Sequence, residues 1–130
     1  MDFTRRIDLD STYDDAIARV KDALKDQGFG VLTEIDVRQT LKEKLDIDVE
    51  PQVILGACNP QLAHQALKID PRVATLLPCN VAVRAEAGRT VVEALDPKII
   101  AEVPDNPALV PIAEEAGKRI QAALDALGSA

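Results

Sequence analysis

Two cysteines occupy similar local settings in this sequence. Cys58 precedes an Asn-Pro pair, and Cys79 lies between a proline and an asparagine. An apolar run that meets asparagine and proline is typical of the junction between a strand and a turn or helix. Side chains at such junctions can line a binding site. We therefore predict Cys58, Asn59, Cys79 and Asn80 as ligand-binding residues.

The chemistry open to these thiols depends on their spacing. Positions 58 and 79 are 21 residues apart, so they do not form the Cys-x-x-Cys motif of redox proteins. With His64 they would offer three N or S ligands, the number in an open zinc site, although the spacing from Cys58 to His64 is not a standard one. Buried structural cysteines, a thiol or redox role and metal ligation all stay open. The favoured interpretation of the two cysteines is structural, and we predict no metal, no cofactor and no catalytic residue.

Other motifs with chemical meaning are weaker. Asp46, Asp48 and Glu50 alternate, which could attract a divalent cation, but the stretch lacks the glycine and spacing of a calcium loop. A solvated acidic edge is the better interpretation. No glycine-rich phosphate loop and no Gly-x-Ser-x-Gly elbow occurs, so nucleotide-binding and hydrolase functions have no support in the sequence.

Composition sets the broad class of the protein. At 130 residues the chain fits one domain, predicted to span residues 1–130. Hydrophobic residues make up 47% of it and aromatic residues only 2%, so the core must be aliphatic. A net charge of -7 repels phosphate backbones, which argues against nucleic acid as a partner. No apolar run is long enough to span a membrane and no signal-peptide pattern opens the chain, so we expect a cytoplasmic protein with reduced thiols and no membrane partner.

Hydrophobic periodicity predicts five strands. The first covers residues 3–10 and the second residues 30–35. The third, residues 51–58, is apolar at successive positions, so it is expected to be covered on both faces, or on one face by a partner chain. Two further strands, residues 79–86 and 89–95, flank Gly88 and predict a hairpin.

Four helices are predicted between and after these strands. The first is capped by Ser11 and ends at Gly28, and its apolar stripe contains Tyr13, Ile17, Val20 and Leu24. A short helix runs from the Asp36 cap to about Leu45, with an inward face of Val37, Leu41 and Leu45. Asn59 caps a third helix, which Asp70 and Pro71 end. The last helix is expected at 111–127, because Pro111 should push Val110 out of α geometry.

Three stretches, residues 27–36, 54–60 and 76–83, resemble the domain of unknown function family numbered 302. The match covers nearly the whole chain in the right order, including the first and last helices. It implies an antiparallel sheet with the long helices on one face, and dimerisation. The family label records no established activity, so it transfers no catalytic residue.

The periodicity agrees with this implied architecture. Two strongly amphipathic helices each have one apolar stripe to bury, and a sheet can receive both on one face. We therefore expect an α+β two-layer sandwich: a mostly antiparallel sheet of about five strands, two long helices on one face, and short helices besides.

Two function classes follow from these features. The first is a homodimeric module that binds a small molecule or protein, without catalysis, near the two cysteines and their asparagines. The second is a thiol- or metal-dependent activity using Cys58 and Cys79. The first is favoured because little positive charge lies near either thiol to lower its pKa. The antiparallel arrangement predicts both cysteines at the same end of the sheet, without a disulfide.

Overall fold

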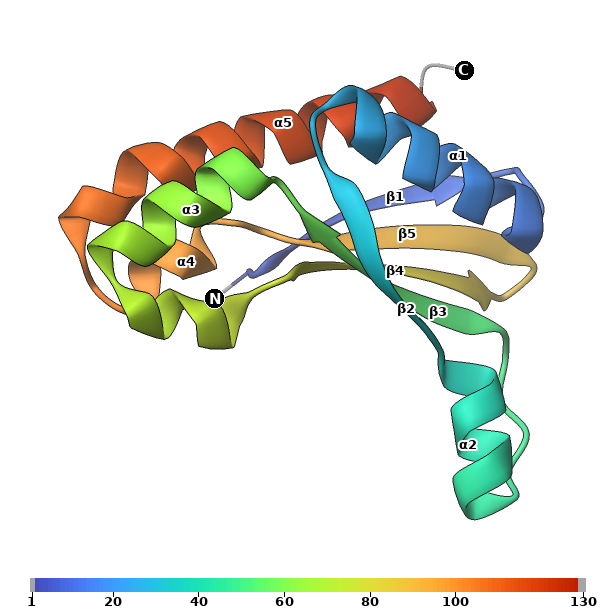
Figure 1. Cartoon of the computed structure of the whole chain (residues 1–130). Helices are drawn as coiled ribbons and strands as arrows, with labels where there is room; N and C mark the ends of the chain where they lie inside the picture. Colours follow the sequence, from blue (N-terminus) through green and yellow to red (C-terminus); the bar gives the residue numbers. More distant parts are fainter. Residues whose placement is uncertain (1, 129–130) are drawn as a thin grey trace.

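The sheet at the centre of the protein has five strands, and every neighbouring pair is antiparallel. The computed structural model describes residues 2–128. The strand order is β1-β5-β4-β3-β2, so β2 and β1 are the edges (Figure 1). The strands are β1 (Thr4–Leu9), β2 (Gly30–Asp36), β3 (Gln52–Cys58), β4 (Cys79–Glu86) and β5 (Arg89–Leu95). All five predicted strands are present within one or two residues of the expected bounds.

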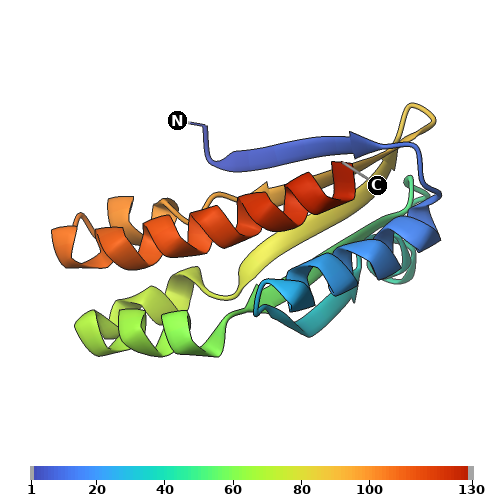
Figure 2. The ribbon, with the colours of Figure 1, turned by 90° about the horizontal axis from the view of Figure 1, so that it is seen from above.

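The long helices lie together on one face of the sheet. Helices α1 (Tyr13–Asp26) and α5 (Val110–Gly128) cover this face, and α3 (Pro60–Ile69) lies beside α5 (Figures 1 and 2). The connections hold α4 (Ile99–Glu102) and two 3₁₀ helices, η1 (Pro71–Leu76) and η2 (Pro107–Leu109). The predicted α+β two-layer sandwich is confirmed. Within residues 2–128, no helix is both long enough and apolar enough to cross a membrane.

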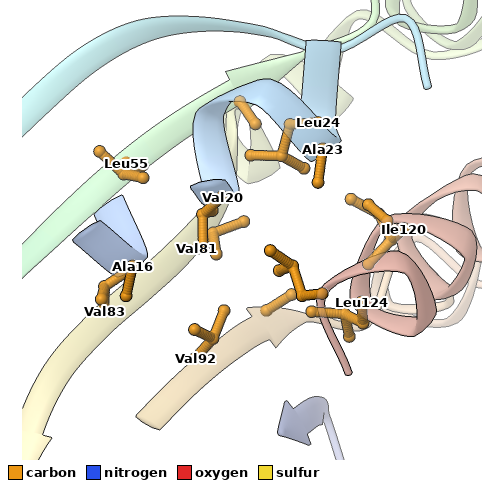
Figure 3. Packing of buried hydrophobic residues seen from close by; sticks show 14 of the residues in the cluster. Ala16, Val20, Ala23, Leu24, Leu55, Val81, Val83, Val92, Ile120 and Leu124 are labelled. Carbon is orange, nitrogen blue, oxygen red and sulfur yellow. The ribbon is translucent and has the colours of Figure 1, made fainter. Parts of the chain in front are cut away.

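The main core lies between this helical layer and the sheet. Val20 and Leu24 of α1 meet Leu55 and Val81 of the sheet, and Ile120 of α5 completes the contact (Figure 3). These side chains are at most 3% exposed. Because Val and Leu side chains each contribute about 1.5–3 kcal/mol when fully buried, the two predicted stripes account for the placement of both helices.

A second apolar cluster extends the core beyond the end of the sheet. It joins α3, α4 and α5 to the start of β4, and its members are Leu62, Ala66, Val73, Cys79, Ile100, Ala101, Leu109, Ile112, Ala113 and Ala116. One of the two cysteines is thus a core residue of this cluster. Periodicity predicted the buried faces of α3 and α5, which meet here.

Two helix starts differ from the sequence predictions. Thr12, and not Ser11, caps α1, because its hydroxyl accepts a hydrogen bond from the Asp15 N–H at 3.2 Å. Helix α5 begins at Val110, whose φ of -58° and ψ of -47° are helical despite the following proline. The 3₁₀ turn η2 leads directly into α5, and Pro111 falls in the first turn, where no intrahelical donor is needed.

The hairpin between β4 and β5 matches its prediction. Ala87 has a φ of 51° and Gly88 a φ of 78°. A two-residue loop with both φ angles positive is the turn that fits the right-handed twist of adjacent strands. It sets the register that pairs Glu86 with Arg89.

Helix α2 (Val37–Leu45) departs most from expectation. Asp36 caps it as predicted, accepting from the Gln39 N–H at 2.9 Å. However, none of its residues is buried, and Leu45 is 63% exposed. The predicted inward face is therefore wrong at Leu45. The helix projects from the sheet, away from α1 and α5 (Figure 1).

Candidate functional site

Both cysteines lie at the same end of the sheet. Strand β3 ends at Cys58, β4 begins at Cys79, and the antiparallel register pairs Ala57 with Cys79. The two thiols are free. The predicted antiparallel pairing of these two strands, with both cysteines at one end of the sheet, is confirmed.

A small cavity joins the two cysteines to Asn59. Its volume is about 20 Å³, enough for about one water molecule and no more. Its other lining residues are apolar and come from both hydrophobic clusters: Phe29, Ala57, Leu62, Ala63, Leu77, Ile112 and Ala116. This cavity marks the seam between the two clusters, and it is too small to receive an organic ligand.

The two thiols differ in environment. Cys79 is 5% exposed, and burial, with a smaller contribution from Cys58, raises the pKa of its thiol to about 11. A thiol with this pKa is protonated at neutral pH, and the protonated thiol is a poor nucleophile and metal ligand. Cys58 is only partly buried. Thiol chemistry at this end of the sheet would therefore depend on Cys58.

Asn59 holds the start of α3 as predicted. Its side-chain oxygen accepts a hydrogen bond from the Leu62 N–H at 3.2 Å, in a buried setting. Its amide nitrogen lies over Gly28, where an added Cβ would come within 3.0 Å of it. Gly28 also has a φ of 83°, so a side chain there would be strained as well as crowded. Asn59 thus caps the start of α3 and packs closely against the turn that follows α1.

The metal-ligation hypothesis gains no support from the geometry. His64 lies on an exposed position of α3. Across residues 2–128, no three His, Cys, Asp or Glu side chains gather closely enough to hold an ion. Of the alternating carboxylates, Asp46 and Asp48 instead pair with Lys42, at 3.0 and 3.5 Å.

Asn80 does not join the other three predicted residues. Neighbouring residues of a strand point to opposite faces, so Asn80 faces away from the cavity that Cys79 lines. It lies on the open face, our name for the side of the sheet opposite α1 and α5. There it borders a hollow of about 570 Å³. The predicted site is therefore divided between two faces of the sheet.

The hollow on the open face is lined by both apolar and polar side chains. Its apolar residues are Phe3, Ile54, Ala82 and Leu95, and its polar residues are Thr4, Gln52, Asn80 and Glu93. Sequence reasoning named only Asn80 among them as a site residue. For Ile54 a signal existed in the successive apolar residues of β3, which place it on the face that α1 and α5 leave uncovered.

Ion pairs cover another part of the open face, over β1, β4 and β5. Arg84 bonds to Glu86 at 3.2 Å and to Glu93 at 3.0 Å. Arg6 bonds to Asp8 at 2.9 Å and to Glu86 at 3.1 Å. The Arg6 bond is the main cause that lowers the pKa of Asp8, whereas a hydrogen bond from Thr4 is the main cause that lowers the pKa of Glu93. With these lowered pKa values, Asp8 and Glu93 are ionised at neutral pH.

The chain matches a known family over nearly its full length. The family model for the domain of unknown function DUF302 matches residues 5–127. The chain belongs to the DUF302 family. A crystal structure of an uncharacterised conserved DUF302 protein from Bacillus stearothermophilus shares 35% sequence identity with it and has a TM-score of 0.91. That match covers 98% of this chain and 99% of the other. No curated protein matches the chain significantly. The DUF302 resemblance seen in the sequence is thus confirmed, and it carries a fold without an assigned activity.

Proposed function

We propose that this chain is a homodimeric binding module, without a catalytic centre of its own, and that a second copy docks on its open face. The observation that carries the proposal is the set of apolar side chains that line the hollow. Ile54 lies on the interior strand β3 with no helix over it, and Phe3, which lines the hollow from the β1 edge, is 54% exposed. Exposed apolar side chains grouped with polar ones are typical of an interaction surface.

The charges of the open face favour a second copy as the partner. The chain carries a net charge of -7, so two copies repel each other over most of their surfaces. On the open face, by contrast, Arg6 and Arg84 alternate with Asp8, Glu86 and Glu93 in paired rows. In a two-fold dimer the same patch meets itself, and a patch that holds both signs of charge is complementary to itself.

A small apolar molecule is a second candidate occupant of the hollow. Small-molecule sites commonly combine apolar side chains with a few polar groups, and the volume of about 570 Å³ lies in their usual range. This hollow, however, lies on one face of a sheet, whereas such sites enclose most of the ligand. In this proposal Asn80 contacts the ligand, while Asn59 and Cys79 support the fold from the other side.

A thiol-dependent activity is the least supported alternative. The buried thiol of Cys79, with its pKa of about 11, is unsuited to nucleophilic chemistry. The cavity that it shares with Cys58 admits no substrate larger than water.

A matched pair of variants tests the docking proposal. We expect Ile54→Lys to convert the dimer to a folded monomer, read by light scattering after size exclusion and by circular dichroism. Ile69→Lys is the control, because Ile69 is 39% exposed on α3, outside the open face. Phe3→Lys serves as a second variant if Ile54→Lys folds poorly. A wild-type monomer, or a dimer that survives both open-face changes, would refute the proposal.

Nile red fluorescence separates the two occupants. If a second copy covers the hollow, dye emission per chain should fall as the protein concentration rises through the range of dimer formation. If the hollow is a small-molecule site, emission per chain should not depend on protein concentration, and it should saturate at one dye per chain.

A further inference from the structure

We propose that the α2 arm, residues 35–50, is a clasp that packs on the open face of the second copy. This inference rests on the proposed dimer and adds the element that completes its interface. The arm projects from the sheet on the side opposite α1 and α5, where the open face lies (Figure 1). Its main contacts within the chain are with β2 and β3, the strands that hold its two ends.

The stability of α2 calls for a partner. The helix has nine residues and none is buried, whereas an isolated helix shorter than about 12–15 residues is marginal in water. Its local supports are the Asp36 cap and exposed pairs such as Lys42 with Asp46, each worth about 1 kcal/mol or less. Packing of an apolar face supplies most helical stability in proteins, so a second copy is a natural source of the missing contact.

The arm has an apolar stripe with cations on both sides. Val37, Leu41 and Leu45 recur every four residues, so they share one face of α2. On a helix with 3.6 residues per turn, Arg38 and Lys44 flank this stripe. The ion-pair ladder of the open face includes exposed carboxylates, at the end of the sheet nearest the β4–β5 turn. An apolar stripe between cations suits a surface that combines apolar side chains with carboxylates.

The area of the open face supports the same conclusion. Its strands are six to eight residues long, and five strands of that length span roughly 500 Å² in projection. A standard interface buries about 800 Å² of accessible surface per partner, and surface contributed by the arm would enlarge the contact made by the sheet face. The arm adds the exposed apolar side chains of Leu45 and Ile47, which are 63% and 43% exposed.

A groove makes the arm continuous with the open face. It has a volume of about 410 Å³ and lies between α2 and the end of the β4–β5 hairpin. Val37 and Leu41 line one side, and Ala85 and Ala87 line the other. Gln52 borders both this groove and the hollow. A second copy seated on the open face would therefore contact the arm without crossing an intervening ridge.

Two variants measure the contribution of the arm. We expect Leu45→Lys to weaken dimerisation by about tenfold or more, because the buried leucine side chain is lost twice per dimer. Val103→Lys is the control, since Val103 is 60% exposed and lies outside the arm; we expect it to leave the dissociation constant unchanged. Both positions are exposed within the single chain, so both variants should fold, as circular dichroism would verify.

Photo-crosslinking locates the contact. Leu45 is replaced by p-benzoyl-L-phenylalanine in unlabelled protein, which is mixed with ¹⁵N-labelled wild type and irradiated. We expect cross-links to labelled peptides from β1, β4 or β5 of the other copy. A dimer with cross-links only to the partner's β2 and α2 would indicate edge pairing and overturn the clasp, as would full-strength dimerisation of Leu45→Lys. In either case the proposed dimer would stand, whereas a monomeric wild type would overturn both.

Discussion

Thr33 of β2 lies directly over Gly56 of β3 on the open face. A Cβ built on Gly56 would come 2.1 Å from the Thr33 hydroxyl oxygen and 2.8 Å from Cγ of Pro78. The two residues are paired in register, just after the irregularity between Val31 and Thr33. The missing side chain of Gly56 thus lets β2 and the chain around Pro78 close over β3 at the edge of the open face.

Gly56→Ala should lower the free energy of unfolding by about 1–3 kcal/mol, the usual effect of overpacking. Urea denaturation would measure it. Gly30→Ala is the matched control, because no atom lies within 4 Å of an added Cβ there, and its effect should stay within about 0.5 kcal/mol. Thr33→Ala in the Gly56→Ala background should restore part of the loss. Equal effects at the two glycines would contradict the close packing at Gly56.

The cap of α3 makes a separate prediction. Asn59→Ala should lower the free energy of unfolding by about 0.5–2 kcal/mol, since a buried N–H of the first turn loses its acceptor. Asn106→Ala, which removes a cap from the short η2 turn in an exposed setting, should lower it less. Melting curves of the two variants, compared with wild type, would measure this order. An Asn59→Ala curve that overlays the wild type would show that the cap is dispensable.

The cysteines should differ in their reactivity toward an aromatic disulfide reagent. At mildly alkaline pH one thiol per chain, that of Cys58, should react readily, because Cys79 is buried and remains protonated. The second should react only after denaturation. Cys58→Ser should abolish the fast phase, and Cys79→Ala should keep it. Two equally fast thiols in the folded protein would contradict the assigned burial.

Stability should also fall in alkali because of Cys79. The pKa of its thiol is about 11 in the folded protein, compared with a reference value of 9.0 for an unperturbed cysteine. The folded state therefore holds the proton more tightly, and the associated stability is complete below about pH 9 and lost as the pH rises toward 11. Two pKa units correspond to about 2–3 kcal/mol. Burial also raises the pKa of Tyr13, so the measurement is the difference in pH dependence between wild type and Cys79→Ala. Parallel curves of stability against pH for the two proteins would contradict this prediction.

Local sequence signals predicted most of the fold. The Asn59 cap, the stripes of α1 and α5 and the turn at Gly88 each depend on residues within a few positions of one another, so periodicity and capping chemistry suffice for them. The N-cap at Thr12 was missed because Ser11 offers the same hydroxyl one residue earlier. The start of α5 at Val110 was missed because the preceding 3₁₀ turn already sets helical geometry.

The site was harder to predict because it depends on the faces of the sheet. Cys79 and Asn80 are adjacent in sequence, but strand alternation sends their side chains to opposite faces. Placing both in one site therefore disregarded the alternation of β4. The exposure of Leu45 was unpredictable for another reason, since an apolar stripe shows that a helix needs a partner surface without showing whether its own chain supplies it.

The docking of a second copy is the central claim, and the mass of the wild-type protein in solution tests it most directly. One chain has a mass of 14.0 kDa. Sedimentation equilibrium at tens of micromolar protein should give twice that mass, and Ile54→Lys should return it to that of one chain while Ile69→Lys does not. A wild-type mass of 14.0 kDa throughout this range would contradict the account.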